Sequence, residues 1–568
     1  MPNVMPIGDV VSRCEQLRGE GAYEESDLLC RRVLVQVPSN AALLFQNASH
    51  AFSAIGPKFS MDRFNRVKVT LPGASAVHYN IGVCHRRMDD HRAAHHHLQK
   101  ALVSNPGAAG ALDALAQTQT EIKQSAMAMK TGLRQVILCP KMSGPYSTLG
   151  FAAWKADRLD VAVFALKTAL LLDPKSCEAD INLGSVLAQM GQHADAIRRY
   201  QRLLRLAPQN PTLCRNMAVA FVNAGDWREA SRIYARYTRL TRGRPENQTG
   251  DDPFPNLPVT PPPRKMEPTA WHRLKFEAEQ MAYLLDQGAI PADFETELIG
   301  YRSIITNLDE TSRAAIAFEL PKKDSDRILR YQNRLVHLAS TEWRLTRSTY
   351  PGRNPPALDM CVDWAGADAD FVESTPSITV IDDFLDPRAL TALRQFCLES
   401  TIWFELKGAG YLGAYFREGF NDPLLLAIAE EMATKMPKTF INHPLRMIWA
   451  YTYEQSMVGI NPHADFAKIN VNFWITPNEA NLDPGTGGLL IYRRPAPISW
   501  GFEKYNAAPS DEIMAFLGAE ARNPIRVPHR QNRAVIFDSR LFHETDRLKF
   551  RPGLENRRIN VTMLFGDQ

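Results

Sequence analysis

Residues 460–476 read INPHADFAKINVNFWIT, and this stretch decides how the C-terminal part of the chain folds. It places His463 and Asp465 two positions apart, just before a run of alternating apolar and polar residues that is typical of a β-strand. Along an extended chain, residues i and i+2 point to the same side. The spacing therefore predicts an imidazole and a carboxylate that face the same point at the entrance of a strand.

A third side chain of suitable chemistry follows far downstream. The short apolar run Ala534–Phe537 predicts another strand, and His543 comes after its end. Two imidazoles and one carboxylate on one face of an octahedral metal ion leave three positions open, as in non-haem Fe(II) oxygenases. Open positions are typical of a catalytic ion rather than a structural one. We therefore predict that His463, Asp465 and His543 bind a catalytic metal.

The spacing His-x-Asp is a weak signal by itself. The 14 histidines and 62 acidic residues among 568 give about 1.5 histidine–acid pairs at this spacing by chance. The chain has two, and the other, His193-Ala194-Asp195, lies in a helical repeat with no strand after it. We expect that second pair to be a turn between helices. The sequence around each pair, rather than the spacing itself, must therefore show which pair belongs to a metal site.

The last predicted strand carries a further set of polar residues. Residues 558–565 read RINVTMLF, which places Arg558, Asn560 and Thr562 on one face and apolar residues on the other. An arginine in that place can bind a carboxylate through two parallel hydrogen bonds. The strand therefore predicts a carboxylate-binding residue near the metal ligands.

Together with Tyr453, Gly459 and the run DPGTGG at 483–488, these stretches resemble the Fe(II)/2-oxoglutarate-dependent dioxygenases, especially their prolyl-hydroxylase-like branch. The resemblance covers 375–568, a third of the chain. It implies a double-stranded β-helix, a distorted jelly roll, with Fe(II) at one mouth. It also implies 2-oxoglutarate and O2 as cosubstrates, with ascorbate as a candidate further cofactor.

The same resemblance implies that the metal ligands are His463, Asp465 and His543, and that the cosubstrate contacts are Arg558, Tyr453 and Asn560. Arg558 would bind the distal carboxylate of 2-oxoglutarate. Prolyl hydroxylases usually carry a lysine at this place, so prolyl specificity does not follow. Arg557 is the alternative, although it should point to the opposite face of the strand from Asn560.

The first 245 residues carry a regular repeat. Small residues recur 24 and 12 positions before several regularly spaced prolines, as at Gly82 and Ala94. They allow the two helices of a hairpin to approach closely, and the proline ends the second helix. The pattern resembles the tetratricopeptide repeat, which implies a right-handed superhelix with a concave peptide-binding groove. The six prolines, each 34 residues from the next, are Pro38, Pro72, Pro106, Pro140, Pro174 and Pro208.

One position in the first helix of each repeat is polar in all repeats but one. Asn80, Asn182 and Asn216 occupy it, two residues before the Gly/Ala position. An amide there can hydrogen-bond the backbone of an extended protein or peptide partner, because it carries both a donor and an acceptor. The alternative is an ordinary solvated position that favours small polar side chains.

Composition excludes some classes of partner. A net charge of +4 over 568 residues predicts no nucleic-acid partner. No run of 18 apolar residues and no signal sequence is present, so we expect no membrane association and a cytoplasmic location. The eight cysteines are scattered without a Cys-x-x-Cys motif, which favours reduced thiols.

The expected fold class is a multidomain α+β protein. Eight prolines between Gly243 and Thr269 predict a semi-rigid linker, and helical periodicity without the 34-residue repeat follows it. The predicted divisions are an all-α repeat superhelix at 1–244, a Pro-rich linker at 245–269, a helical segment of unknown role at 270–350, and the jelly roll at 375–568.

A long insertion separates two predicted strands of the C-terminal domain. Residues 493–530 exceed the length of a hairpin connection, and they include Trp500 and Tyr505. Aromatic residues on such a segment could form a lid over a substrate. The alternative is that the segment packs its apolar residues on the outside of the barrel or against the helices of 270–347.

Two classes of function remain open from the sequence. The first is a 2-oxoglutarate-dependent hydroxylase whose repeats recruit a protein or peptide. The second is an interaction scaffold, with the barrel either vestigial or acting on an unrelated small molecule. The presence of all the expected site residues in order favours the enzyme.

Overall fold

The computed structural model describes residues 6–54, 56–244, 254–257, 268–333, 355–408, 410–457 and 460–567. Most of the predicted Pro-rich linker, residues 334–354 and Gly459 lie outside the described residues. The chain forms two compact units, Met1–Leu203 and Leu204–Gln568. None of the described helices is long and apolar enough to cross a membrane.

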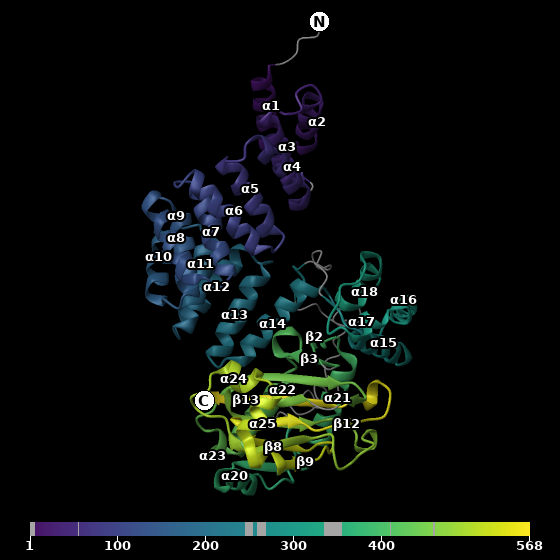
Figure 1. Ribbon diagram of the computed structural model, residues 1–568. Coiled ribbons are helices and arrows are strands. Elements are labelled where there is room, and N and C mark those ends of the chain that lie inside the picture. Colours follow the sequence, from purple (N-terminus) through teal and green to yellow (C-terminus); the bar gives the residue numbers. More distant parts are fainter. Residues whose placement is uncertain are drawn as a thin grey trace. The chain divides into compact units, whose positions relative to one another are not determined.

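Fourteen described helices form seven successive hairpins in residues 7–242 (Figure 1). Consecutive helices from α1 to α11 pack against each other, and so do α13 and α14. Six hairpins lie in or begin in the first unit, and the seventh belongs to the second. The helices are α1 (Ile7–Gly19), α2 (Tyr23–Leu34), α3 (Ala41–Ala54), α4 (Pro57–Thr70), α5 (Ser75–Arg87), α6 (His91–Ser104), α7 (Ala109–Glu121), α8 (Ser125–Leu138), α9 (Ser143–Lys155), α10 (Leu159–Leu172), α11 (Cys177–Gln189), α12 (His193–Leu206), α13 (Pro211–Asn223) and α14 (Trp227–Arg242).

The positions that predicted the repeat have the expected structural roles. The second helix of each of the first six hairpins ends shortly before its regularly spaced proline. A Cβ built on Gly150 would lie 2.5 Å from Leu166 Cγ, and one built on Gly184 would lie 2.8 Å from Tyr200 Cε1. The helices of a hairpin therefore approach too closely there for a larger residue.

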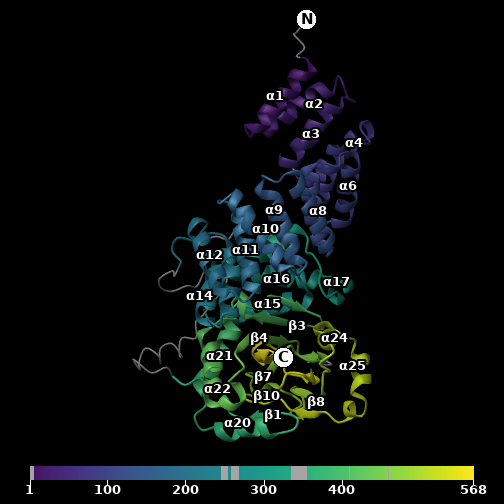
Figure 2. The same ribbon diagram turned by 90° about the vertical axis from the view of Figure 1, so that its left-hand side faces the viewer.

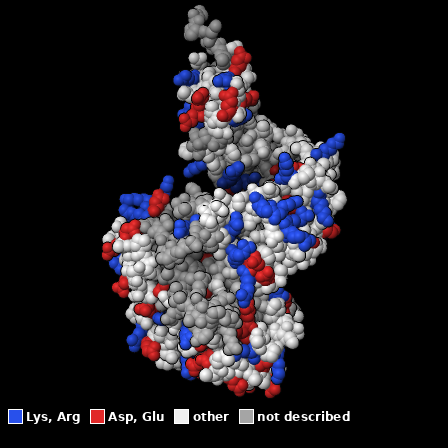
Figure 3. All heavy atoms as spheres, turned by 180° about the vertical axis from the view of Figure 1, so that it is seen from behind, with Lys and Arg blue, Asp and Glu red and all other residues white. Residues whose placement is uncertain are grey.

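Arginines are frequent on α12, and they have acidic partners. Arg199 and Arg202 both pair with the buried Asp180, and Arg198 pairs with Asp195. Figure 3 shows lysines and arginines gathered over part of the helical hairpins and interspersed with acidic side chains elsewhere on that face. Ion pairs of this kind reduce the net field that such a surface presents.

The second unit contains a helical segment with its own small core. Leu274, Met281, Tyr301, Ile328 and Tyr331 form the centre of this core. Tyr331 donates a hydrogen bond from its hydroxyl to Gln280 Oε1 at 2.6 Å. The helices are α15 (Trp271–Asp286), α16 (Phe294–Asn307), α17 (Glu310–Ala314) and α18 (Lys322–Asn333).

The rest of the second unit is rich in antiparallel β-structure. A seven-stranded sheet has the order β1-β10-β7-β13-β4-β3-β2, a four-stranded sheet has the order β6-β11-β8-β9, and β5 pairs with β12. The strands are β1 (Ile378–Ile381), β2 (Glu405–Lys407), β3 (Tyr411–Tyr415), β4 (Leu445–Tyr453), β5 (Ser456–Met457), β6 (Ile460–His463), β7 (Ala467–Trp474), β8 (Leu489–Pro495), β9 (Ile525–Val527), β10 (Ala534–Asp538), β11 (Leu541–Thr545), β12 (Leu548–Lys549) and β13 (Ile559–Asp567).

The two larger sheets face each other across an apolar core. Trp474 and Phe537 from the large sheet pack with Leu489, Ile491 and Leu541 from the small one. Further helices surround the sheets (Figure 2). They are α20 (Trp364–Glu373), α21 (Pro387–Glu399), α22 (Pro423–Lys435), α23 (Pro437–Phe440), α24 (Phe502–Ala507) and α25 (Ser510–Leu517).

Strand β7 has different residues on its two faces. Phe473, on the apolar face, packs against Phe384 with ring centroids 5.1 Å apart. Asn470 and Asn472 alternate with the apolar residues, and both are buried. Successive side chains of a strand point to opposite faces, so the two asparagines share the face of Trp474 that looks toward the small sheet.

Within the second unit, helices on the far side of the predicted domain boundaries, at residues 244 and 375, pack with the β-rich region. The ring of Trp227 on α14 lies 5.1 Å from that of Phe416, and the Arg228 guanidinium donates to the Glu430 carboxylate. Helix α20 contacts β1, and it lies before residue 375, the predicted start of the jelly roll. The seventh hairpin and α20 thus pack with the β-rich region.

Candidate metal centre

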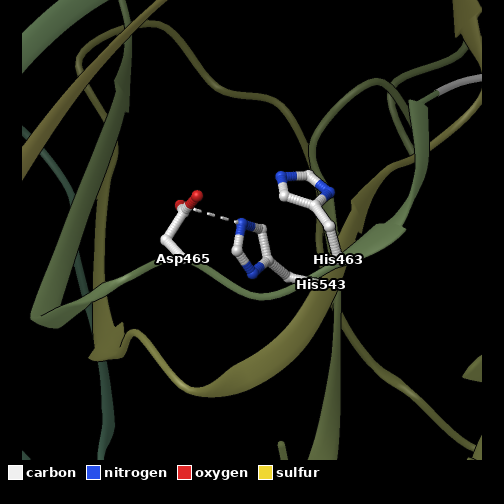
Figure 4. A group of neighbouring side chains, drawn as sticks. All are labelled: His463, Asp465 and His543. Atoms are coloured by element: carbon white, nitrogen blue, oxygen red, sulfur yellow. Dashed lines mark ion pairs between the residues drawn. The ribbon is translucent and has the colours of Figure 1, made fainter. Parts of the chain in front are cut away.

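Three elements bring the predicted ligands together. His463 ends β6, Asp465 lies in the turn between β6 and β7, and His543 lies within β11 directly opposite His463. The ligand atoms all lie within 4.8 Å of one another, and Asp465 Oδ2 is 3.6 Å from His543 Nε2 (Figure 4). The sequence placed His543 after the end of a strand, whereas it belongs to a strand of its own.

Both imidazoles are oriented by a backbone carbonyl of their own strand. His463 Nδ1 donates to Asn461 O at 2.9 Å, and His543 Nδ1 donates to Leu541 O at 3.0 Å. A carbonyl oxygen can only accept, so the proton of each neutral ring is on Nδ1. The Nε2 lone pairs are then available for a metal, which is the usual arrangement of histidine ligands.

The electrostatics of the cluster favour the ligand forms. Burial lowers the pKa of His543 to about 3, and the neighbouring His463 adds to the effect, so the His543 ring is neutral at pH 7. Burial raises the pKa of Asp465, while His463 and the Asn470 amide lower it. Asn470 Nδ2 donates to Asp465 Oδ2 at 2.8 Å. A divalent cation would balance the negative charge of the buried Asp465 carboxylate, so these three side chains suit a metal ion.

Among the described residues, this is the one group of three or more His, Cys, Asp or Glu side chains with such a geometry. The second His-Ala-Asp sequence differs in structure. His193 is the first residue of α12 and Asp195 pairs with Arg198, so this pair lies in the first helical turn rather than in a turn between helices. Two nitrogens and one carboxylate oxygen suit a non-haem Fe(II) centre.

The insertion 493–530 supports the ligand-bearing turn. Ala464, between the two ligands, donates its N–H to Tyr505 O at 2.9 Å and accepts from Asn506 Nδ2 at 3.0 Å. The Trp500 ring packs on Phe516 and Phe542, with centroids 4.9 and 6.0 Å apart. Of the two alternatives, the described contacts correspond to packing on the outside of the barrel.

We therefore expect Trp500→Ala to lower the stability of the protein and to leave the KM for a substrate unchanged. Loss of the ring should lower the free energy of unfolding by about 1–3 kcal/mol, measured by denaturant titration. Ile498→Ala is a matched control, because Ile498 lies in the same segment and is 93% exposed. An unchanged stability together with a raised substrate KM in Trp500→Ala would instead favour the lid.

Arg558 lies fully buried beside a pair of glycines. Its Nε donates to Gly487 O at 2.6 Å and its Nη2 donates to Gly488 O at 3.4 Å. The guanidinium carbon lies 4.6 Å from the centroid of the Tyr453 ring. A Cβ on Gly488 would collide with the carbonyl oxygen of Val527, so only glycine fits there. The Gly-Gly pair thus presents two carbonyls to the arginine.

Arg557 and Arg558 have different kinds of partner. Arg557 donates to Glu279 Oε2 at 2.9 Å and to Glu454 Oε1 at 3.1 Å, so its charge is already paired. Among the described residues, the hydrogen bonds of Arg558 go to neutral acceptors, which include Asn560 Oδ1 at 3.1 Å. The Asp546 carboxylate acts on Arg558 electrostatically but pairs with Arg526, and a buried guanidinium whose hydrogen bonds go to neutral acceptors favours an anionic ligand. The geometry therefore favours Arg558 over Arg557 as a carboxylate-binding residue.

Two residues near Arg558 were missed from the sequence. His529 lies 6.1 Å from Trp474, measured between ring centroids, and Trp474 lies 5.8 Å from the Arg558 guanidinium carbon. Neither ring nitrogen of His529 nor the indole nitrogen of Trp474 has a hydrogen-bond partner among the described residues. Burial lowers the pKa of His529 to about 3, with Arg558 adding to the effect. The cluster offers uncharged donors to an anion beside the guanidinium.

Tyr453 and Asn560, the other predicted cosubstrate contacts, belong to the same cluster. Burial raises the pKa of Tyr453, whereas Arg558 and Thr545 beside its hydroxyl lower it. Asn560 is 4% exposed and accepts from Arg558. Both therefore lie beside the guanidinium, within a buried polar cluster.

The candidate peptide-binding asparagines lie on the first helices of three hairpins. Asn80, Asn182 and Asn216 are each half-buried. Asn80 Nδ2 donates to Ala76 O at 2.8 Å within its own helix. Half-burial leaves these positions accessible to a partner, and the ladder of contacts to a peptide stays a prediction.

Comparisons with known proteins concern the repeats. Two family profiles described as Tetratricopeptide repeat match residues 148–211 and 187–248. PilF of Pseudomonas aeruginosa is 14% identical, covering 36% of this chain and 94% of that one, with a TM-score of 0.33. A tetratricopeptide repeat protein from Parabacteroides merdae is 10% identical, covering 40% and 91%, with a TM-score of 0.36. MamA from Desulfovibrio magneticus is 19% identical, covering 30% and 96%, with a TM-score of 0.28.

No curated protein matches the chain. The profile matches, the 34-residue period and the helical hairpins together identify tetratricopeptide repeats in this protein. Repeats of this kind generally bind protein partners. The protein therefore combines tetratricopeptide repeats with an antiparallel β-rich region.

Proposed function

We propose that this tetratricopeptide-repeat protein is an Fe(II)- and 2-oxoglutarate-dependent dioxygenase that hydroxylates a protein or peptide recruited by its repeats. The observation that carries the proposal is the convergence of His463, Asp465 and His543, with their ligand atoms within 4.8 Å of one another. The two facing antiparallel sheets support the assignment of a double-stranded β-helix.

The metal ligands in this proposal are Nε2 of His463, a carboxylate oxygen of Asp465 and Nε2 of His543. Fe(II) bound there would supply the activation of O2 that couples decarboxylation of 2-oxoglutarate to hydroxylation of a substrate. The protein's part is to hold the two rings with their Nδ1 protons on backbone carbonyls and the carboxylate against Asn470. These contacts fix the direction of each ligand before the metal arrives.

Arg558 binds and orients the cosubstrate in this proposal. Its guanidinium is held by the Gly487 and Gly488 carbonyls and by Asn560, so little side-chain entropy is lost when a carboxylate binds. One ring nitrogen of the neutral His529 and the indole nitrogen of Trp474 lie in the same cluster and can donate to the same carboxylate. Burial of the whole cluster strengthens these bonds by excluding water.

The repeats support a macromolecular substrate. Asn80, Asn182 and Asn216 are the residues that we propose contact the backbone of the recruited protein or peptide. Presence of the full ligand set favours an enzyme over a scaffold with a vestigial barrel. Binding of peptides without any turnover of 2-oxoglutarate would favour that scaffold.

The test is release of succinate from 2-oxoglutarate by the purified full-length protein with Fe(II), ascorbate and O2. We expect slow release without substrate, faster release with a peptide that the repeats bind, and inhibition by N-oxalylglycine, which lacks a decarboxylation route. Peptide mass spectrometry should then detect a gain of one oxygen. Absence of Fe(II)-dependent release, together with absence of Mn(II) binding, would overturn the proposal.

A further inference from the structure

A continuous row of buried side chains joins the metal site to the cosubstrate cluster. It starts at Asp465, passes through three asparagines and ends at Arg558. Its members come from the turn after β6, from β7, from β13 and, for Arg558, from the residue just before β13. The hydrogen bonds are Asn470 Nδ2 to Asp465 Oδ2 at 2.8 Å, Asn472 Nδ2 to Asn470 Oδ1 at 3.1 Å, Asn560 Nδ2 to Asn472 Oδ1 at 2.9 Å, and Arg558 Nη1 to Asn560 Oδ1 at 3.1 Å.

The two ends of the row determine the orientation of all three amides. An ionised carboxylate only accepts, so Asn470 must turn its NH2 toward Asp465 and its oxygen toward Asn472. A guanidinium only donates, so Asn560 must turn its oxygen toward Arg558. Asn472 then completes the row in one direction, with every amide donating toward the carboxylate and accepting from the side of the arginine.

The row is costly unless it is complete. Asn470, Asn472 and Asn560 are 0, 5 and 4% exposed, on sheet faces that normally carry apolar side chains. A buried amide without a partner costs roughly 1–3 kcal/mol, so each asparagine depends on its neighbours for its hydrogen bonds. Hydrogen bonds in such chains also strengthen one another. A change at one link therefore alters the position of the others.

We propose that Asn470, Asn472 and Asn560 are positioning residues that couple the metal-ligand carboxylate to the cosubstrate-binding arginine. The inference rests on the proposed function for the roles of Asp465 and Arg558. A metal bound at Asp465 stabilises the orientation of Arg558 that binds 2-oxoglutarate. In the same way, 2-oxoglutarate bound at Arg558 stabilises the orientation of Asp465 that binds the metal. Asn472 is the decisive residue, because its hydrogen bonds among the described residues join it to other asparagines and to neither end.

The test uses Asn472→Leu in the full-length protein, with two binding measurements and no turnover. The first is the affinity of the metal-free protein for Mn(II), and the second is the affinity of the Mn(II)-saturated protein for 2-oxoglutarate without O2. We expect the Mn(II) affinity to fall about 10- to 100-fold, as for other residues that orient metal ligands. We expect the 2-oxoglutarate affinity to fall about two- to tenfold, the equivalent of one net hydrogen bond.

Thr562→Val is the matched control. Thr562 lies on β13, is 2% exposed and accepts a hydrogen bond from Asn560 Nδ2 at 3.3 Å. This bond is not one of the four that join Asp465 to Arg558. It should leave the Mn(II) affinity within about twofold of wild type, because it interrupts no link of the row. Thermal melting of each metal-free variant reports any general loss of folding.

Asn472→Ala is the second variant if Asn472→Leu does not fold. It can neither donate to Asn470 nor accept from Asn560, so it should lower both affinities as well. Wild-type affinities at both sites in a folded Asn472 variant would overturn the coupling and leave the proposed function intact. A wild-type protein that binds neither Mn(II) nor 2-oxoglutarate would overturn both.

Discussion

The His543→Ala protein should release less than about 1% of the succinate that the wild-type protein releases from 2-oxoglutarate. His543 supplies one of three ligand atoms, and its removal leaves one imidazole and one carboxylate, too few to hold Fe(II) against water. Succinate should be measured with Fe(II), ascorbate and saturating 2-oxoglutarate. The Mn(II) affinity of the metal-free protein should fall in parallel.

His193→Ala is the control for this prediction. It changes the histidine of the second His-Ala-Asp sequence, which lies at the start of α12, and should leave succinate release unchanged. His543 is 3% exposed, so its replacement also leaves a cavity, and a thermal melt must show that the variant is folded. Wild-type succinate release by a folded His543→Ala protein would exclude this metal site.

The Arg558→Met protein should require a much higher concentration of 2-oxoglutarate. Methionine keeps an apolar stem against Tyr453 and Trp474 but loses the charge-assisted hydrogen bonds to a carboxylate. Such a loss is worth roughly 1.5–3 kcal/mol, so the KM for 2-oxoglutarate should rise about 10- to 150-fold. Succinate release over a range of 2-oxoglutarate concentrations measures the change. Mn(II) should still bind, because all three metal ligands remain.

Arg557→Met should have the opposite profile. The two carboxylates that pair with Arg557, those of Glu279 and Glu454, would lose their counter-ion. We expect the free energy of unfolding to fall by roughly 1–3 kcal/mol, while the KM for 2-oxoglutarate changes little. A higher KM in Arg557→Met than in Arg558→Met would show that the neighbouring arginine binds the cosubstrate.

The parts of this structure that follow from local sequence could be predicted. The 34-residue period specifies helical hairpins because each repeat uses the same small residues and the same terminating proline. The alternation after Arg558 specified which residues share a face, because side chains alternate along any strand. The closeness of His463 to Asp465 follows in the same way, although Asp465 lies in a turn and not on a strand.

The pairing between distant strands could not be predicted from local sequence, and the meeting of His543 with His463 was expected from the chemistry of their side chains and the family resemblance alone. His543 meets His463 because β11 pairs with β6 in one register, and a shift by one residue would turn the ring away. The row of asparagines depends on the pairing of β13 with β7, although the alternating Asn470 and Asn472 were a visible signal of a polar interior face. His529 follows a proline in a connection with no periodic pattern, so nothing in the sequence indicated its place.

The ion pairs of Arg557 and the packing of α14 have a practical consequence for isolating the β-rich region. A recombinant fragment that starts at residue 375 would lack α15, so Glu279 would no longer neutralise Arg557 and the strand that carries Arg558 would lose a support. A start at residue 268 would keep α15 but remove Trp227 from the Phe416 ring and leave an aromatic surface exposed to solvent. Soluble expression of the β-rich region should therefore require a fragment that starts before α13 and so includes the last tetratricopeptide hairpin.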